Sequence, residues 1–282
     1  MNVVGLGSAG CRIAQCLSKY GVYNIYQVDN IDDGYENFLP MKEQENHEDY
    51  EKNYEKLNLD IEGPATLILC GAGKITGATL RILQELRNSK VKILYIKPRT
   101  SDTSDIQKIR HKLVNQILQE LTRSGLLEEF LIVDNERIEK IANPTIIDYW
   151  NPINQLIADT FHMVNVFRNT EPLLKSNNKV PNTSRITTFS LVNFEESSEE
   201  MFYDLQTPRA KSYYFALSEN YIKENRNLLP DVREFISSRQ EENCDYAYSI
   251  FQTAYDQNYA YGYHYATLIQ EQDKNLFTSE EE

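Results

Sequence analysis

Short apolar runs alternate with helix-like stretches along the first 168 residues, and this alternation limits the folds open to the chain. The runs at 65–70, 91–96 and 130–133 are almost entirely apolar, which is typical of strands buried on both faces of a sheet. The helix-like stretches between them are long enough to cross from one parallel strand to the next. The sequence therefore predicts an α/β protein with a mostly parallel sheet and helices on both of its faces.

The pattern changes after residue 168. Asn, Ser and Pro are frequent between 169 and 184, and the later strand-like runs lie around one helix-like stretch at 228–238. The predicted organisation is a first domain at 1–168 that ends with a central helix at 152–168, a linker at 169–184, a smaller α+β domain at 185–270 and an acidic tail at 271–282.

A glycine-rich segment, Gly5-Leu-Gly7-Ser-Ala-Gly10, joins the first predicted strand to the first predicted helix. It fits the pattern G-x-G-x-x-G, in which backbone N–H groups can approach a phosphate. Asp29 follows Gly10 by about 20 residues, where a dinucleotide-binding fold places a carboxylate for ribose hydroxyls. These features favour a Rossmann-like nucleotide-binding sheet. The alternative is a glycine-rich turn that only joins a strand to a tightly packed helix.

A second glycine-rich segment runs from Gly71 to Gly77, again between a predicted strand and a predicted helix. An NAD enzyme needs only the first segment, whereas a nucleoside diphosphate or triphosphate gains from amides and helix dipoles on two sides. The segment is not a Walker A loop, because Lys74 precedes Thr76 by two positions. Lys74 could contact a phosphate or could be a solvated surface lysine.

At this point the order of features resembles the tubulin/FtsZ family over most of the chain. GLGSAGCRIA resembles the first phosphate loop of the family, and GAGKITG resembles its GGGTGTG signature but departs from it at Ala72, Lys74 and Ile75. VDNIDD at 28–33 and IVDNERI at 132–138 match further segments of the family, and the order of elements after residue 184 is similar to its second domain.

The resemblance implies a guanine nucleotide, GTP or GDP with or without Mg²⁺, and head-to-tail association into filaments. It places Asn135 and Glu136 at the ribose and Asn154 at the base, although each asparagine could instead cap a helix or lie on the surface. The nucleotide-binding residues expected in this way are Gly5, Gly7, Ser8, Ala9, Gly10, Cys11, Arg12, Asp29, Gly71, Ala72, Gly73, Lys74, Ile75, Thr76, Gly77, Asn135, Glu136 and Asn154.

Two departures from the family concern hydrolysis. The loop that contacts the terminal phosphate is replaced by an acidic stretch at 41–62, expected here to be a solvated loop or surface helix that repels phosphate. Between 169 and 184 Glu171 is the only carboxylate, where the family has a pair. We therefore expect weak or absent GTP hydrolysis and leave the catalytic residues open. A non-catalytic structural protein and an NAD-binding enzyme stay open as alternatives.

The composition excludes several partners. A formal net charge of -13 disfavours nucleic acid and anionic membranes. Four scattered cysteines favour a reducing compartment, and the four histidines have no partners at metal-ligand spacing. Cys11 lies where a helix dipole could lower its thiol pKa, but packing is its expected role. With neither a leader nor a membrane-spanning run in the sequence, we expect a cytoplasmic protein.

Four tyrosines alternate at 259, 261, 263 and 265, which places their rings on one face of a strand. We expect this face to pack in the core under the helix at 228–238. The alternative is an exposed aromatic patch for a partner, including another copy of the chain.

Overall fold

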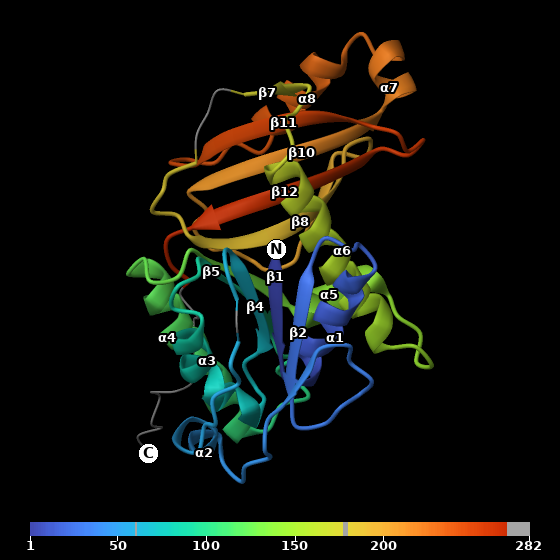
Figure 1. Cartoon of the computed structure of the whole chain (residues 1–282). Helices are drawn as coiled ribbons and strands as arrows, with labels where there is room; N and C mark the ends of the chain where they lie inside the picture. The colour runs from blue at the N-terminus through green and yellow to red at the C-terminus, as the bar shows by residue number, and fades with distance from the viewer. Residues whose placement is uncertain (60, 177–179, 270–282) are drawn as a thin grey trace.

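The computed structural model describes residues 1–59, 61–176 and 180–269, which form two halves around one continuous sheet (Figure 1). The strand order is β3-β2-β1-β4-β5-β6-β8-β12-β10-β11-β7, with β9 paired to β8. The strands are β1 (Asn2–Leu6), β2 (Asn24–Asp29), β3 (Phe38–Pro40), β4 (Ala65–Cys70), β5 (Val91–Lys97), β6 (Glu129–Asp134), β7 (Leu174–Lys175), β8 (Ile186–Asn193), β9 (Ser198–Met201), β10 (Ala210–Ser218), β11 (Asp245–Thr253) and β12 (Tyr259–Ala266).

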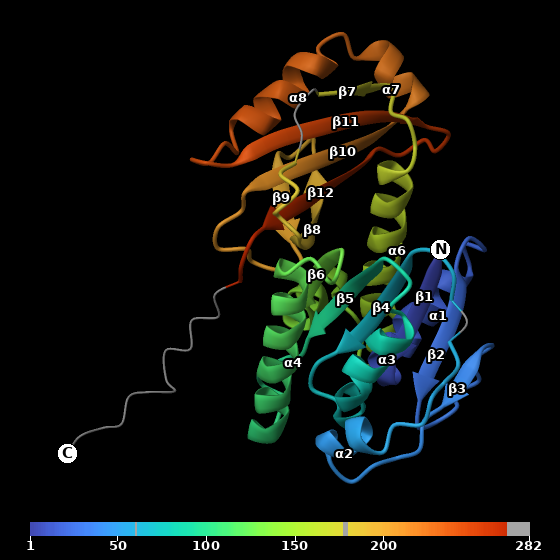
Figure 2. The same ribbon diagram turned by 60° about the vertical axis from the view of Figure 1, so that its left-hand side comes forward.

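All strand pairs from β3 to β6 are parallel, as the alternation of strands and helices predicts. Helices on both sides bury this half of the sheet, with α1, α5 and α6 on one face and α2, α3 and α4 on the other (Figures 1 and 2). The predicted α/β fold class is therefore confirmed. The helices are α1 (Gly7–Ser18), α2 (His47–Lys52), the 3-10 helix η1 (Lys74–Ala78), α3 (Thr79–Glu85), α4 (Asp105–Arg123), α5 (Asn135–Ala142), α6 (Trp150–Arg168), α7 (Glu219–Glu224) and α8 (Leu228–Ser237).

The second half contains a smaller mixed sheet. β8, β12 and β10 are antiparallel neighbours, whereas β10 and β11 are parallel. One face of this sheet packs on α6, and α8 buries Val232, Phe235 and Ile236 against the other. The stretch predicted as a linker contributes β7, which pairs with β11 at the edge of the sheet.

Several short elements have no clear signal in the sequence. The helix α5 begins directly after β6 without a loop, because the carboxylate of Asp134 caps it by accepting a hydrogen bond of 2.9 Å from the Glu136 N–H. The strands β3 and β9 and the helix α7 are six residues or shorter. Elements of this length have too few residues for a hydrophobic period to show.

The acidic stretch at 41–62 is more firmly attached than expected. It contains the short helix α2, whose Tyr50 is buried and donates a hydrogen bond of 2.8 Å to the Asn30 side chain. The carboxylate of Glu85 on α3 accepts hydrogen bonds from the backbone N–H groups of Leu57 and Leu59. Its charged side chains lie mostly at the surface, while apolar and backbone contacts hold the segment against α3 and η1.

The alternating tyrosines are core residues, but the helix that covers them is not the expected one. Tyr263 and Tyr265 are buried in the cluster that includes α6, and the Phe167 ring lies 5.9 Å from that of Tyr261. The opposite face of β12 points toward α8. Core packing is therefore confirmed for the middle of the strand, and its predicted position under the helix at 228–238 is wrong. Tyr259, the first residue of the strand, is 36% exposed.

A buried ionic cluster lies where the two halves meet. The carboxylate of Glu129, at the start of β6, contacts Arg168 at 3.0 Å and Lys92 at 3.3 Å, and it accepts a hydrogen bond from Tyr263 of β12. Burial alone would raise the pKa of Glu129, but the two cations hold that pKa below its ordinary value. The backbone ladder between the halves is short, with only two residue pairs joining β6 to β8.

Candidate functional site

The sheet order 3-2-1-4-5-6 places a topological switch point between β1 and β4, where ligands bind in open α/β sheets. The first glycine segment lies at this point and leads directly from β1 into α1. Gly7 has φ of +70°, a conformation that favours glycine. The N-terminus of α1 has no side-chain cap and no acidic residue in its first turn. Its first N–H groups are therefore open to an anion.

The other two glycines of this segment are needed for packing. A Cβ on Gly5 would lie 2.6 Å from the Gly10 carbonyl oxygen, and a Cβ on Gly10 would lie 2.2 Å from the Ile68 carbonyl oxygen of β4. Cys11 is fully buried beside them, and burial raises its thiol pKa. The tight-packing interpretation of the glycines therefore holds at Gly5 and Gly10, and Cys11 is a packing residue as expected.

A cavity of about 390 Å³ opens on the α1 side of the switch point, at the carboxyl ends of β4, β5 and β6. It brings together five of the predicted site residues, which come from α1, α5 and α6: Ser8, Ala9, Arg12, Asn135 and Asn154. Its other lining residues are Ile13, Cys70, Ile96, Pro98, Arg99, Asp102, Thr103 and Trp150.

The two predicted asparagines face this cavity from different helices. Asn135 is the first residue of α5, and Asn154 is buried in the second turn of α6. Glu136 is not among the residues that line the cavity within the described part of the chain, and its carboxylate pairs with Lys140 at 3.2 Å. Arg12 reaches the rim and pairs with Asp33 at 3.2 Å.

Sequence reasoning missed the rim formed by the β5–α4 loop and the start of α6. Arg99 follows β5 directly and is held by Asp102 at 3.3 Å and by Glu139 at 2.7 Å. Trp150, the single tryptophan of the chain, begins α6. The signal available for Arg99 was its position, because residues just after parallel strands commonly form the site in such sheets.

Asp29 stabilises the first glycine segment by hydrogen bonds. Its carboxylate accepts hydrogen bonds of 3.0 Å from the Ser8 hydroxyl and 2.8 Å from the Asn30 N–H. It is buried and is not among the cavity residues of the described chain. The Asp29 carboxylate therefore stabilises the loop conformation, whereas in a dinucleotide enzyme the carboxylate at this position would bind the ribose.

The second glycine segment turns away from the cavity. Within the described ranges, no residue from Gly71 to Gly77 lines it. A Cβ on Gly71 would overlap the Tyr95 hydroxyl, and a Cβ on Gly77 would overlap the His47 carbonyl oxygen. Gly73 is exposed, and a Cβ there would make only ordinary contacts at 3.8 Å or more, whereas Ala72 is buried. These glycines fit under α2 and beside β5.

The side chains of the second segment are also engaged by the acidic stretch. Lys74 donates to the Gln44 carbonyl oxygen at 3.3 Å. The Thr76 hydroxyl donates to the Gly73 carbonyl oxygen at 2.7 Å and lies 3.3 Å from the His47 ring. Ile75 is buried, and its Cγ2 atom lies against Gly7 of the first segment.

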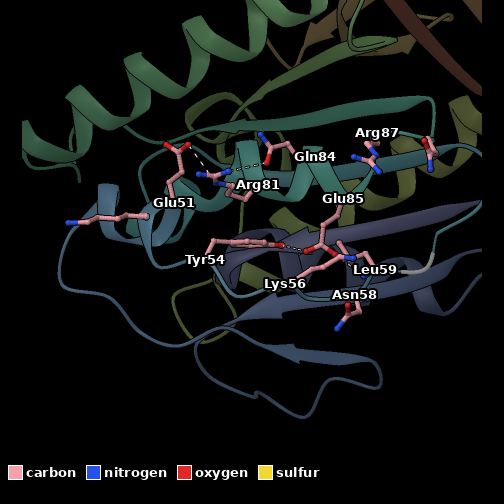
Figure 3. Close-up of a pocket in the computed structure, with 11 residues that line it drawn as sticks. Glu51, Tyr54, Lys56, Asn58, Leu59, Arg81, Gln84, Glu85 and Arg87 are labelled. Atoms are coloured by element: carbon pink, nitrogen blue, oxygen red, sulfur yellow. Dashed lines mark hydrogen bonds and ion pairs between the residues drawn. The ribbon is translucent and has the colours of Figure 1, made fainter.

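A larger hollow of about 740 Å³ lies elsewhere, between the 51–59 stretch and α3 (Figure 3). Its lining is polar, with Arg81 paired to Glu51 at 3.8 Å. Glu85, which projects into this region in Figure 3, already accepts hydrogen bonds from Tyr54, Leu57 and Leu59. The hollow contains neither glycine segment, so the smaller cavity is the candidate site.

Two further observations concern metal ligands and membrane-spanning helices. In the part of the chain that the structure describes, no three His, Cys, Asp or Glu side chains converge as metal ligands would. Over the same residues, no helix is both long and apolar enough to cross a membrane.

Comparison with solved structures identifies the fold. A protofilament of TubZ from Bacillus thuringiensis serovar israelensis, in its GTPγS form, superposes with a TM-score of 0.67 at 14% identity, covering 94% of this chain and 86% of that one. FtsZ from M. jannaschii gives 0.67 at 10% identity over 94% and 87% of the two chains. CetZ from Methanosaeta thermophila gives 0.66 at 11% identity over 95% and 86%. No protein-family model and no curated protein matches the sequence.

The chain therefore has the tubulin/FtsZ fold, in which a parallel sheet is joined by a central helix to a smaller second half. The resemblance indicated by its two glycine segments is confirmed for the fold. At these identities the likeness establishes the fold, and it establishes neither a ligand nor an assembly.

Proposed function

We propose that this protein binds a guanine nucleotide in the cavity at the switch point and assembles head to tail into filaments. The observation that carries the proposal is the convergence of the first glycine segment with Asn135 and Asn154 around one cavity of about 390 Å³. A cavity of this size suits a small organic ligand, since such sites commonly span ~300–1,000 Å³. The TubZ structure of the same fold is a GTPγS-form protofilament.

The residues around the cavity fit the parts of a nucleotide. The uncapped N-terminus of α1 presents the N–H groups of Ser8 and Ala9, where a phosphate is stabilised by hydrogen bonds and by the helix dipole. Arg12 adds a cation on the same side. The side-chain amide of Asn154 can donate to and accept from a base edge, and Asn135 can do so at the ribose.

The proposed activity is binding with little or no hydrolysis. Glu171 is the single carboxylate between residues 169 and 184, and it is exposed and paired with Lys175 at 3.0 Å. A general base must be held within hydrogen-bond reach of the water that it activates. We therefore expect phosphate release from GTP to stay near background even at protein concentrations where filaments form. A steep rise with concentration would show that a second subunit completes a hydrolytic site.

A non-catalytic structural role is the second candidate, and the same isolated Glu171 favours it. An NAD-binding role has less support, because Asp29 is occupied by Ser8 and Asn30. NADH should therefore bind more weakly than a guanine nucleotide.

Equilibrium binding tests the nucleotide. GDP, GTP, ATP and NADH would each be titrated with Mg²⁺ into the purified protein, followed by calorimetry and by the fluorescence of Trp150, which lies at the cavity rim. We expect guanine nucleotides to bind in preference to ATP and NADH. Preferential binding of NADH would favour an oxidoreductase. Failure of all four nucleotides to bind would favour a structural protein with this fold.

A matched pair of variants on α6 tests the base contact. Asn154→Ala removes the buried amide in the cavity and should lower guanine-nucleotide affinity by about tenfold or more, since an unpaired polar group in the site costs free energy. Asn151→Ala, one turn earlier on an exposed position, should leave affinity unchanged. Equal affinity of the two variants would remove Asn154 from the site.

Assembly is tested by sedimentation and electron microscopy of the protein with and without nucleotide. Head-to-tail contacts are heterologous and repeat without closing, so they should produce filaments of variable length. Particles of one fixed size would indicate a closed oligomer instead. We also propose a cytoplasmic location, where guanine nucleotides are available.

A further inference from the structure

We infer that the nucleotide held by this chain carries at most two phosphates, because Ile75 closes the way from the first glycine segment to the second. The inference rests on the proposed guanine-nucleotide site and specifies its ligand. It predicts a preference for the nucleoside diphosphate or monophosphate over the triphosphate.

The position of Ile75 is the first observation. Its Cγ2 atom occupies the space beside Gly7, and a Cβ built on Gly7 would lie only 2.8 Å from it. Ile75 is 7% exposed and belongs to the core on the α3 side of the sheet. An apolar side chain therefore fills the gap between the two glycine segments.

The residue type at position 75 is the second observation. In the GGGTGTG pattern that the second segment resembles, the position of Ile75 is a glycine, which has no side chain. Isoleucine is branched at Cβ and stiff about χ1, and here it packs in a core with Ala78 and Ile82. Moving it aside would leave a cavity in that core, so it is a fixed barrier.

The second segment is also poorly prepared for a phosphate. Lys74, its only cation, is turned to the Gln44 carbonyl oxygen of the acidic stretch. The N–H of Thr76 donates to the Gly73 carbonyl oxygen. The stretch that covers the segment carries eight carboxylates and three lysines between 41 and 62, so its charge disfavours a further anion.

The first segment alone offers few donors for a terminal phosphate. The first segment and α1 contribute Ser8, Ala9 and Arg12 to the cavity, and the other cation of its lining, Arg99, is already paired with Asp102 and Glu139. A triphosphate adds charge that a diphosphate lacks, and that charge needs further hydrogen bonds or cations when it leaves water. With the second segment closed off, a terminal phosphate would remain unpaired.

The test compares GMP, GDP and GTP with Mg²⁺ on the wild-type chain, by calorimetry and Trp150 fluorescence. GDP should bind at least about tenfold more tightly than GTP, since a charged group left without hydrogen bonds costs that much or more. GTP binding as tight as GDP binding would overturn the inference and leave the proposed function standing. Failure of all three nucleotides to bind would overturn the proposed function and the inference with it.

Two substitutions at the same position assign the preference to the side chain. Ile75→Gly opens the gap and should reduce the GDP-to-GTP affinity ratio by about tenfold, chiefly by tightening GTP. Ile75→Val keeps the branched side chain and should keep the wild-type ratio. An unchanged ratio in a folded Ile75→Gly protein would show that Ile75 is not the barrier. If that variant does not fold, the wild-type ratio and Ile75→Ala decide the question.

Discussion

Replacing Gly10 by alanine tests how the first glycine segment is built. Gly10 lies in the first turn of α1, and the space for its Cβ is taken by the Ile68 carbonyl oxygen of β4, at 2.2 Å. Gly10 is buried in α1, and Ile68 is a buried residue of the central strand β4. Neither can rotate away, so α1 would have to move from β4 by about 1 Å to reach an ordinary carbon–oxygen separation of ~3.3 Å.

The expected loss of stability follows from two opposing effects. Extra atoms forced into a packed core cost about 1–3 kcal/mol and occasionally more. Alanine in place of glycine in a helix contributes about 1 kcal/mol in the favourable direction. Because a backbone contact of 2.2 Å is a severe overlap, we expect Gly10→Ala to lower the free energy of unfolding by roughly 2 kcal/mol.

Urea unfolding followed by circular dichroism measures this change, with Gly73→Ala as the matched control. Gly73 has φ of -70°, and its nearest neighbours to a new Cβ lie 3.8 Å away or more. The control should unfold at the wild-type urea concentration. It should also bind GDP normally, because Gly73 lies outside the cavity. A Gly10→Ala protein as stable as wild type would refute the packing argument.

Three further results are expected. Glu129→Gln should lower the free energy of unfolding by about 2 kcal/mol in urea, because the buried side chain loses its charged contacts with Arg168 and Lys92; a near-neutral change would contradict an ionic junction at this position. Burial alone would raise the pKa of Glu199, but the hydrogen bond and charge of His264 hold it at about 2, below the ordinary 4.5. The ionised Glu199 carboxylate therefore stabilises the fold above pH 4.5. Roughly 3 kcal/mol of the free energy of unfolding should be lost as the pH falls toward 2. Acid titration of Glu199→Gln should show a weaker dependence of stability on pH over this range. Cys11 should resist alkylation until the protein unfolds, since burial raises its pKa; native-state labelling of Cys11 by mass spectrometry would argue for a more open loop.

The fold could be predicted because its strongest elements carry their own periodicity. The strand at 65–70 is almost entirely apolar, and it appears in the structure with the predicted bounds. The tyrosine stripe of β12 was predicted to be buried, but its covering helix was not predictable, since alternation fixes a face and not the element that packs on it. The short helix α5 escaped notice because its start depends on one cap, Asp134.

The candidate site was predicted in part. Ser8, Ala9 and the two asparagines meet at one cavity, since the switch point and the start of α6 bring them together. The orientation of the second glycine segment could not be read from its sequence. It depends on where Ile75 packs and on the contacts that His47 and Gln44 make from a distant stretch. Such tertiary contacts leave no local pattern.

The narrow junction between the halves has a mechanical consequence. Two residue pairs join β6 to β8, and further backbone hydrogen bonds run from Phe130 to Arg185 and from Asp134 to Phe202, so the backbone connection between the halves is short. The cluster of Glu129, Arg168 and Tyr263 connects the two halves through side-chain contacts. Glu129 is buried, whereas the Arg168 side chain is 31% exposed, so separating the pair would leave the carboxylate without its cation. The apolar core that α6 shares with both halves, together with this cluster, should therefore keep the molecule stiff under a small torque.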